Sequence, residues 1–488
     1  MDNSIKKNIG LQTAFQILNT CLPLITAPYL SRVLGATSLG IYSFTSSIVL
    51  YFTLFAMLGT VNYGTRTIAI KKGNKEELSR NFWGIFSLQV IVTAFCLVAY
   101  VFYMIKICQD NYTIAWLQGI TVISCFFDVS WLFFGIENFK FTVVRSMEIK
   151  ILTVVSILFW VKSPEDLWLY TLIMSIGTLA NQIVLWAYVP RYVSIVKISM
   201  KDIFSHIKPN IVLFIPLLAM SVYHIMDKTM LGILSSYEQC GYYYNADKLI
   251  NIPLCVINGV GTVMLPRMTA LYNYGKREEA NSLFMVSLEG IALVSIAMGC
   301  GIAAIAEEFI PFFFGKGYDT CIRLTMVLSP VLVIKGLTNT IRTQYLVPLK
   351  KEKYYINSVL SGAATNLVFN FVLIPRLGAM GAVLGTIFAE LVACLIQFCV
   401  IAKEFYFRKY IQNCMLYILS GIIMFFVVRI LSMFQLGLMF KLILEITVGV
   451  IVYVGLTGFW VYITKSQIYD EIFSGFIRQI IGSRKNTR

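Results

Sequence analysis

The sequence predicts an all-α polytopic membrane protein with about 14 transmembrane helices. Three observations support this fold class: the composition, the length of the apolar segments and the distribution of positive charge. Of the 488 residues, 58% are hydrophobic and only 13% are charged, and a soluble fold cannot cover that much apolar surface. We therefore expect most of these side chains to be buried in lipid.

Apolar segments long enough to cross a bilayer, which takes about 20 helical residues, recur along the whole chain. Pro23 and Pro28 interrupt the first segment and Pro253 interrupts the eighth, which is typical of membrane helices that bend. The fourteen segments are 11–33, 39–63, 82–105, 112–136, 142–161, 166–189, 210–234, 242–265, 282–306, 320–346, 354–374, 379–401, 411–431 and 438–463.

Positive charge predicts the orientation of these helices. If the N-terminus is cytoplasmic, 29 of the 40 Lys and Arg residues fall in cytoplasmic segments, eight fall outside and three lie within helices. This bias is the positive-inside rule, and it places both termini in the cytoplasm. The net charge of +15 is therefore a sign of topology, and we expect no nucleic-acid partner.

One sequence pattern occurs twice, about 200 residues apart. The first copy spans 66–77 (RTIAIKKGNKEE) and the second spans 267–279 (RMTALYNYGKREE). Each copy follows an even-numbered segment on the predicted cytoplasmic side. The offset corresponds to six segments, so both copies keep the same orientation, which predicts two parallel six-helix repeats with a substrate site between them. Chance similarity of charged loops is the alternative explanation.

These patterns predict the organisation of the chain. The tail carries apolar residues at helical spacing and ends in Ser483, Arg484 and Lys485, so it either lies on the inner leaflet or packs against the last helices. The predicted parts are an N-terminal six-helix half at 1–189, a cytoplasmic linker at 190–209, a C-terminal six-helix half at 210–401, helices 13 and 14 at 402–463, and a cytoplasmic amphipathic basic tail at 464–488.

Charged side chains inside membrane helices are costly and therefore indicate function. Lys228 and Lys248 lie in the seventh and eighth segments, next to Asp227 and Asp247. Two interpretations stay open. In the first, Asp–Lys pairs only fasten the two helices together; in the second, the lysines form a cationic wall that holds an anionic ligand. Arg32 lies at the outer end of the first segment.

Acidic residues such as Asp128, Glu148, Glu289 and Glu390 lie within predicted helices. They are either ion-coupling carboxylates or neutral, hydrogen-bonded packing residues, and the sequence does not separate these roles.

Three arginines, Arg66, Arg145 and Arg267, lie near predicted cytoplasmic helix ends. They either determine topology or receive an anionic group at the inner mouth of a substrate path, where Arg is a better bidentate phosphate partner than Lys.

Four blocks of the sequence resemble motifs of the bacterial lipid-linked oligosaccharide flippases, the polysaccharide exporters of the MATE-like MOP superfamily. The blocks occur in family order and at family spacing, and the resemblance covers essentially the whole chain. They are Asp128–Lys140 in the fourth segment, Asp227–Gly232 in the seventh, Gly241–Lys248 in the eighth and Pro375–Glu390 entering the twelfth.

The resemblance implies a flippase of the bacterial plasma membrane that moves undecaprenyl-diphosphate-linked oligosaccharide repeat units to the outer face by alternating access, for O-antigen, capsule or exopolysaccharide. It implies no cofactor and no metal site, leaves coupling to H⁺ or Na⁺ open, and makes the polysaccharide polymerase machinery a candidate partner. The implied substrate-binding residues are Arg32, Lys228, Lys248, Arg66, Arg145 and Arg267, and the implied ion-coupling or buried acids are Asp128, Asp227, Asp247 and Glu390.

Three other functions are compatible with parts of this pattern. A cation-coupled multidrug exporter of the same superfamily would usually have twelve spans, and a lipid II flippase would share the fourteen-span plan. A polyprenyl-linked glycan polymerase or transferase would need a large outer loop with catalytic residues, whereas the longest predicted outer connection is about 306–320. No metal-spaced cluster, phosphate loop or nucleophile elbow occurs in the sequence. We therefore predict that the protein is not an enzyme.

Overall fold

The computed structural model describes residues 3–108, 110–434 and 436–465, and every regular element in these residues is helical. Ten helices in this part of the chain are long and apolar enough to cross a membrane. The prediction of an all-α polytopic membrane protein is therefore confirmed. The chain forms two compact units, Met1–Tyr244 and Asn245–Arg488. We call them the N-terminal and C-terminal units; the predicted halves and linker stay predictions.

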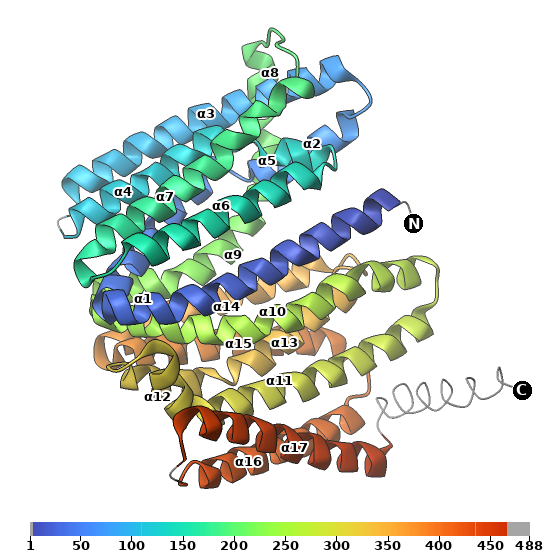
Figure 1. Ribbon diagram of the computed structural model, residues 1–488. Helices are drawn as coiled ribbons and strands as arrows, with labels where there is room; N and C mark the ends of the chain where they lie inside the picture. The colour runs from blue at the N-terminus through green and yellow to red at the C-terminus, as the bar shows by residue number, and fades with distance from the viewer. Residues whose placement is uncertain (1–2, 109, 435, 466–488) are drawn as a thin grey trace, which may run out of the picture. The chain divides into compact units, whose positions relative to one another are not determined.

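The N-terminal unit is built from antiparallel helices joined by short connections (Figure 1). Its elements are α1 (Asn3–Met57), α2 (Thr60–Lys71), α3 (Lys75–Lys106), α4 (Tyr112–Ser124), η1 (Cys125–Phe127), α5 (Ser130–Gly135), α6 (Phe139–Trp160), η2 (Pro164–Asp166), α7 (Leu167–Ile183), η3 (Val184–Ala187), η4 (Val189–Arg191), α8 (Met200–Ser205), α9 (Ile207–Leu234) and the first turns of α10 (Tyr237–Asn273).

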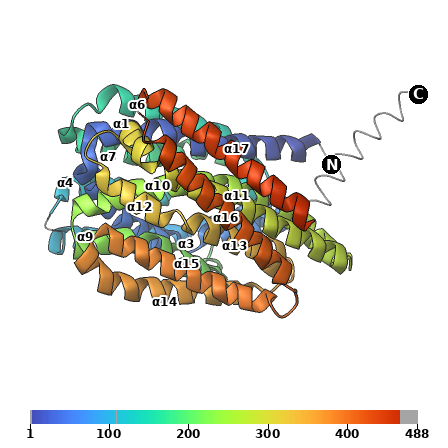
Figure 2. The same ribbon diagram turned by 90° about the horizontal axis from the view of Figure 1, so that it is seen from below.

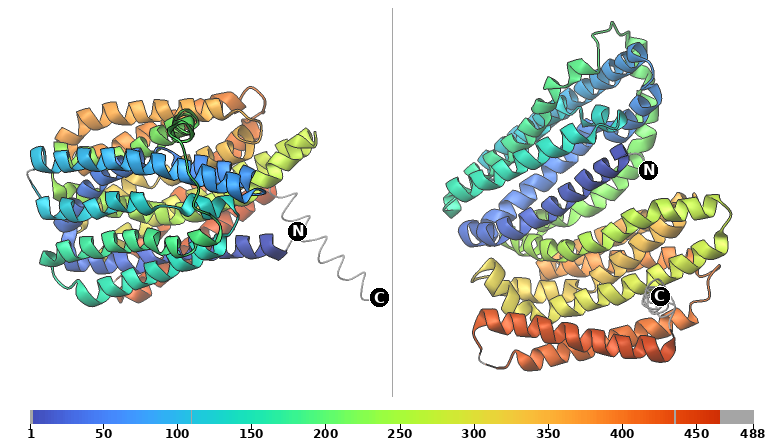
Figure 3. Two further views of the ribbon diagram at one scale, coloured as in Figure 1. Left: turned by 90° about the horizontal axis from the view of Figure 1, so that it is seen from above. Right: turned by 45° about the vertical axis from the view of Figure 1, so that its right-hand side comes forward.

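The C-terminal unit contains the rest of α10 and seven further α-helices. Within it, α14 and α15 lie side by side, and so do α16 and α17 (Figure 2). Both helices of the second pair also pack on α11 (Figure 3, right). The elements are α11 (Arg277–Phe314), α12 (Asp319–Leu328), α13 (Val331–Ile341), the π-helical turn η5 (Arg342–Leu346), α14 (Glu352–Leu377), α15 (Ala379–Ile401), α16 (Arg408–Leu431) and α17 (Leu438–Thr464).

All fourteen predicted segments fall on helices, but the helix ends differ from the predicted ones. The first two segments form the single element α1, in which only Gly35 has a non-helical backbone (φ 76°, ψ 172°). A side chain would disfavour that conformation, so glycine permits the reversal without a longer loop. The second predicted helix ends at Met57, because Leu58 and Gly59 both adopt positive φ before α2 begins.

The fourth and tenth predicted helices are each broken. In the fourth, Asp128 is extended (φ −73°, ψ 106°) between η1 and α5. In the tenth, Ser329 and Pro330 separate α12 from α13. The two breaks differ, because Ser329 and Pro330 keep helical dihedral angles, and the predicted repeat stays a prediction.

The two copies of the repeated pattern adopt the same local structure, a helix, a tight turn and the next helix. In the first copy, the Asn74 side chain accepts from the backbone N–H groups of Glu76 and Glu77 at 3.0 and 3.2 Å and caps α3. In the second, Gly275 provides the positive φ of 74° for the turn before α11. Acidic residues then occupy the first turn of both following helices, where they complement the helix dipole.

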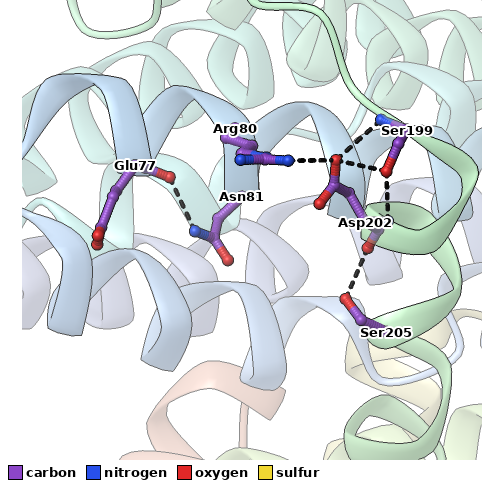
Figure 4. Close-up of polar contacts among 6 residues, drawn as sticks. All are labelled: Glu77, Arg80, Asn81, Ser199, Asp202 and Ser205. Atoms are coloured by element: carbon purple, nitrogen blue, oxygen red, sulfur yellow. Dashed lines mark hydrogen bonds and ion pairs between the residues drawn. The ribbon is translucent and has the colours of Figure 1, made fainter.

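The segment between α7 and α9 is fixed to α3. Arg80 forms a 3.1 Å ion pair with Asp202 of α8, and Ser199 caps α8 through Asp202 in a capping box (Figure 4). The backbone and hydroxyl of Ser199, followed by Arg80, lower the pKa of Asp202. Trp83 adds a 3.0 Å hydrogen bond to the carbonyl of Ser194. The predicted tail at 464–488 lies, apart from residues 464 and 465, outside the described residues.

One end of the C-terminal unit is held by an acidic residue that follows α15. Glu404 accepts from Lys351 and from Arg277, each at 2.7 Å. Hydrogen bonds from Lys351, then Tyr345 and Arg277, lower the pKa of Glu404 to about 2. The carboxylate is therefore ionised at physiological pH and fastens the start of α11 to the turn before α14.

Candidate functional site

The break in the fourth helix is built around Asp128. The carboxylate accepts from the backbone N–H of Ser130 at 2.9 Å and so starts α5. The Gln89 amide, from α3, donates to the carbonyls of Cys125 and Asp128 at 2.6 and 2.9 Å. The Trp131 indole completes the network by donating to the Gln89 side chain at 3.1 Å. The backbone carbonyls of Cys125 and Asp128, next to the break, thus accept hydrogen bonds from a side chain. Within a membrane no water is available to supply such bonds.

Arg145 is the most deeply buried of the predicted substrate-binding arginines. It lies two turns into α6 with only 8% of its surface exposed. One guanidinium nitrogen, Nη2, donates to Ser146 at 3.2 Å, and Ser146 donates to Asn181 of α7 at 3.1 Å. Among the described residues, Nε and Nη1 have no hydrogen-bond acceptor. Arg145 is therefore held in place while two of its donor groups stay unused.

The predicted acidic and basic groups of α9 interact with tyrosines at the start of α10. Asp227 is buried and accepts from the Tyr243 hydroxyl at 2.5 Å. Lys228 lies over the Tyr244 ring, 5.5 Å from its centroid. The aromatic run at 242–244 thus holds the Asp–Lys pair of α9 within the N-terminal unit. Whether Lys228 also binds substrate stays a prediction.

Two glycines let α1 and α10 approach closely beside these charges. A Cβ on Gly40 would lie 1.6 Å from the Tyr237 carbonyl oxygen, and one on Gly241 would lie 1.9 Å from the Ala36 carbonyl oxygen. Both distances are far below van der Waals contact, so only glycine fits. The close contact between α1 and α10 fixes the first turns of α10, which carry Tyr243 and Tyr244.

Further along α10, in the C-terminal unit, Asp247 and Lys248 are half-buried. Asp247 accepts from the Asn251 amide at 2.8 Å, one helical turn later. Beside them, both side-chain polar atoms of the fully buried Asn245 have no protein hydrogen-bond partner among the described residues.

Two of the acidic residues predicted within spans have polar partners in the C-terminal unit. Glu390 of α15 is buried and lies 3.5 Å from the ammonium group of Lys335 on α13. Glu289 of α11 accepts from Asn413 at 2.8 Å and from Tyr417 at 2.7 Å, both on α16. Glu289 therefore joins α16 to α11. Glu148, in contrast, is exposed on α6.

Three of the predicted substrate-binding arginines are exposed in this structure. Arg32 lies on α1, Arg66 on α2 and Arg267 near the end of α10. Their shared role with Arg145 stays a prediction.

Sequence reasoning missed several groups. Gln89 could have been recognised as a candidate polar contact, since it is a lone amide side chain within the apolar segment 82–105. The bond of Tyr243 to Asp227 has no signature in sequence spacing. Glu308 and Glu445, which lie within predicted or observed spans of the C-terminal unit, were not singled out at all.

Comparison with known proteins places this architecture in a family. The family model described as "Polysaccharide biosynthesis protein" matches residues 5–272, more than half of the chain. The chain belongs to that family. A protein of Escherichia coli (strain K12) named as an O-antigen transporter is 22% identical over 397 residues, covering 80% of this chain and 95% of the relative.

Solved structures share the fold. A lipid II flippase, MurJ, in an inward closed conformation has a TM-score of 0.77 at 15% identity and covers 93% of this chain and 100% of the flippase. An inward-facing multidrug resistance MATE family transporter of the MOP superfamily has a TM-score of 0.57 at 12% identity, covering 78% of this chain and 97% of the transporter. The predicted MOP-type fold is confirmed. The relatives are transporters and flippases, in agreement with the prediction that this protein is not an enzyme.

Proposed function

We propose that this protein flips an undecaprenyl-diphosphate-linked oligosaccharide repeat unit from the cytoplasmic to the outer face of the plasma membrane. The family assignment and the similarity to a named O-antigen transporter support a substrate of cell-surface polysaccharide synthesis. The likeness to a lipid II flippase supports a lipid-linked form of it. Such a substrate carries a glycan and a diphosphate across about 30 Å of hydrocarbon that solvates neither.

The observation that carries this proposal is the geometry of Arg145. Its guanidinium is buried and anchored through Ser146 and Asn181, yet Nε and Nη1 have no acceptor among the described residues. The Nε–H group and Nη1 lie on opposite sides of the planar guanidinium group, so each can donate to a different oxygen of a diphosphate. A diphosphate would supply acceptors and also offset the cost of a buried, incompletely bonded cation.

The remaining parts of the mechanism belong to the same proposal. Arg66 and Arg267 receive the diphosphate near the cytoplasm, and Lys228, Lys248 and Arg32 serve the outer part of its path. Alternating access is supported by the prolines inside α1 and α10, since prolines are points where helices bend. Both termini are cytoplasmic, and the polymerase machinery receives the product.

The test is complementation in a bacterium that lacks its own repeat-unit flippase but keeps the rest of its polysaccharide pathway. We expect this chain to restore surface polysaccharide. Cells that gain drug resistance without polysaccharide would contradict the proposal and favour a multidrug exporter. Rescue of a strain depleted of its lipid II flippase, without polysaccharide export, would instead favour lipid II, the second candidate that the TM-score of 0.77 supports.

A second experiment asks whether Lys228 binds substrate or only fastens helices. We expect Lys228→Gln to reduce export by about tenfold, since one charge-assisted bond is worth about 1.5 kcal/mol. If pairing with an aspartate were its whole role, adding Asp227→Asn or Asp247→Asn would restore export, because no uncompensated buried charge would remain. We expect the neutral double variants to stay defective. Surface polysaccharide is measured against membrane abundance, and full export by Lys228→Gln at normal abundance would exclude a substrate role.

A further inference from the structure

Five charged residues converge in the C-terminal unit where α11, α16 and α17 pack together. Arg429 of α16 forms ion pairs with Glu307 and, at 3.4 Å, with Glu308 of α11. Lys441 of α17 lies 3.1 Å from the other oxygen of Glu308. Glu445 is one turn after Lys441 on the same helix. We call this set the α11–α17 charge cluster: Glu307, Glu308, Arg429, Lys441 and Glu445.

Glu445 has the least solvent contact and the fewest bonds in this cluster. Only 1% of its surface is exposed, and neither carboxyl oxygen has a hydrogen-bond partner among the described residues. It is the eighth residue of α17, roughly 10 Å from the start of that helix at 1.5 Å per residue. An ionised carboxylate without bonds at such a place would carry a large desolvation penalty.

The charge balance of the cluster also disfavours an ionised Glu445. Three carboxyl groups face two cations, so full ionisation leaves one negative charge in excess. The cations are already engaged: Arg429 with Glu307 and Glu308, and Lys441 with Glu308. Glu445 is thus the carboxyl group without a cation of its own. A single bound positive charge would neutralise the set.

A proton satisfies this site better than a metal cation. Sodium would require several oxygen ligands and would have to sit beside Arg429 and the Lys441 ammonium group, both of which repel it. A proton forms a covalent O–H bond with one Glu445 oxygen and needs no coordination shell. The resulting carboxylic acid is neutral and can donate to a neighbouring carboxylate oxygen.

We propose that the α11–α17 charge cluster is a proton-binding site, in which Glu445 takes up one proton from the aqueous phase and thereby keeps α17 packed against α11. The positive-inside pattern places this end of the helices on the outer side of the membrane. Exposed Glu307, whose side chain is 49% accessible, marks the edge of the cluster that water reaches. Loss of the proton leaves Glu445 and Glu308 as two like charges on packed helices, which loosens their contact.

Infrared difference spectroscopy on the purified full-length protein tests this proposal. Between acidic and alkaline samples, we expect a carbonyl stretch of a protonated carboxylic acid that disappears in Glu445→Gln. Glu308→Gln should abolish the same band, because the cluster then holds two carboxylates and two cations and needs no proton. Glu289→Gln is the matched control: another buried glutamate of α11, but one bonded by Asn413 and Tyr417, so its variant should keep the band.

Thermal unfolding in detergent gives an independent measurement on the same proteins. The folded state holds a proton that the unfolded chain releases, so stability should fall as pH rises. Glu445→Gln mimics the protonated acid and should flatten this dependence. A band that persists in Glu445→Gln, or an unchanged pH dependence of unfolding in that variant, would overturn the proposal. Neither measurement depends on which substrate the protein transports.

Discussion

Replacing Arg145 by Gln is expected to reduce polysaccharide export by about a hundredfold while leaving membrane abundance unchanged. Glutamine keeps a polar group at the site but removes the charge and the guanidinium fork. Two charge-assisted bonds to a diphosphate, each worth about 1.5 kcal/mol, account for a change of that size. Arg145→Lys should recover only part of the activity, because lysine retains the charge but loses the planar, spaced donors of the guanidinium group.

The matched control for this experiment is Arg408→Gln. Arg408 is an exposed arginine at the start of α16, so its substitution changes the same chemistry away from the proposed site and should leave export intact. Surface polysaccharide is normalised to the amount of protein in the membrane. If Arg145→Gln exports normally, the buried guanidinium serves only packing, and the diphosphate must be bound elsewhere.

The largest loss of stability is expected from Gly241→Ala. The added methyl carbon would meet the Ala36 carbonyl oxygen at 1.9 Å, and both groups belong to helix backbones that have no rotamer to change. The helices would have to separate by about 1 Å or more, and overpacking of this kind costs about 3 kcal/mol or more. We expect little folded protein in the membrane and a lower unfolding temperature in detergent.

Gly259→Ala, in the same helix, is the comparison variant. Nothing lies within 4 Å of the position that its methyl carbon would take, so we expect it to be neutral or stabilising by about 0.5–1 kcal/mol, the ordinary gain of Ala over Gly in a helix. Equal stability of Gly241→Ala and Gly259→Ala would show that the close crossing of α1 and α10 is not needed for folding.

The fold could be predicted from sequence because membrane helices are specified by local features. Apolar length, loop charge and a repeated pattern each act over tens of residues at most. Breaks inside helices were harder to predict. Nothing in the run around Asp128 shows that the chain leaves the helix there, since the break depends on Gln89 and Trp131 supplying bonds from elsewhere.

The candidate site could be predicted only in part, because sequence gives charge but not partners. Arg145 was identified from its position near a helix end, whereas its burial and unused donors follow from the packing of α6 on α7. Asp227 was predicted to pair with a lysine, and its bond to the Tyr243 hydroxyl has no signature in the sequence. Glu445 was not noticed, because its significance lies in what surrounds it: two cations already engaged by other carboxylates.

The glycine crossing also has a symmetry that its distances reveal. Gly40 and Gly241 are 201 positions apart, and so are the residues whose carbonyls they meet, Ala36 and Tyr237. Position 40 therefore contacts 237 in the same way that 241 contacts 36. Reciprocal contact of this kind defines an isologous interface, the type that two identical subunits form about a two-fold axis. Within the N-terminal unit, the start of α10 therefore packs on α1 as an equivalent segment related by a two-fold axis would.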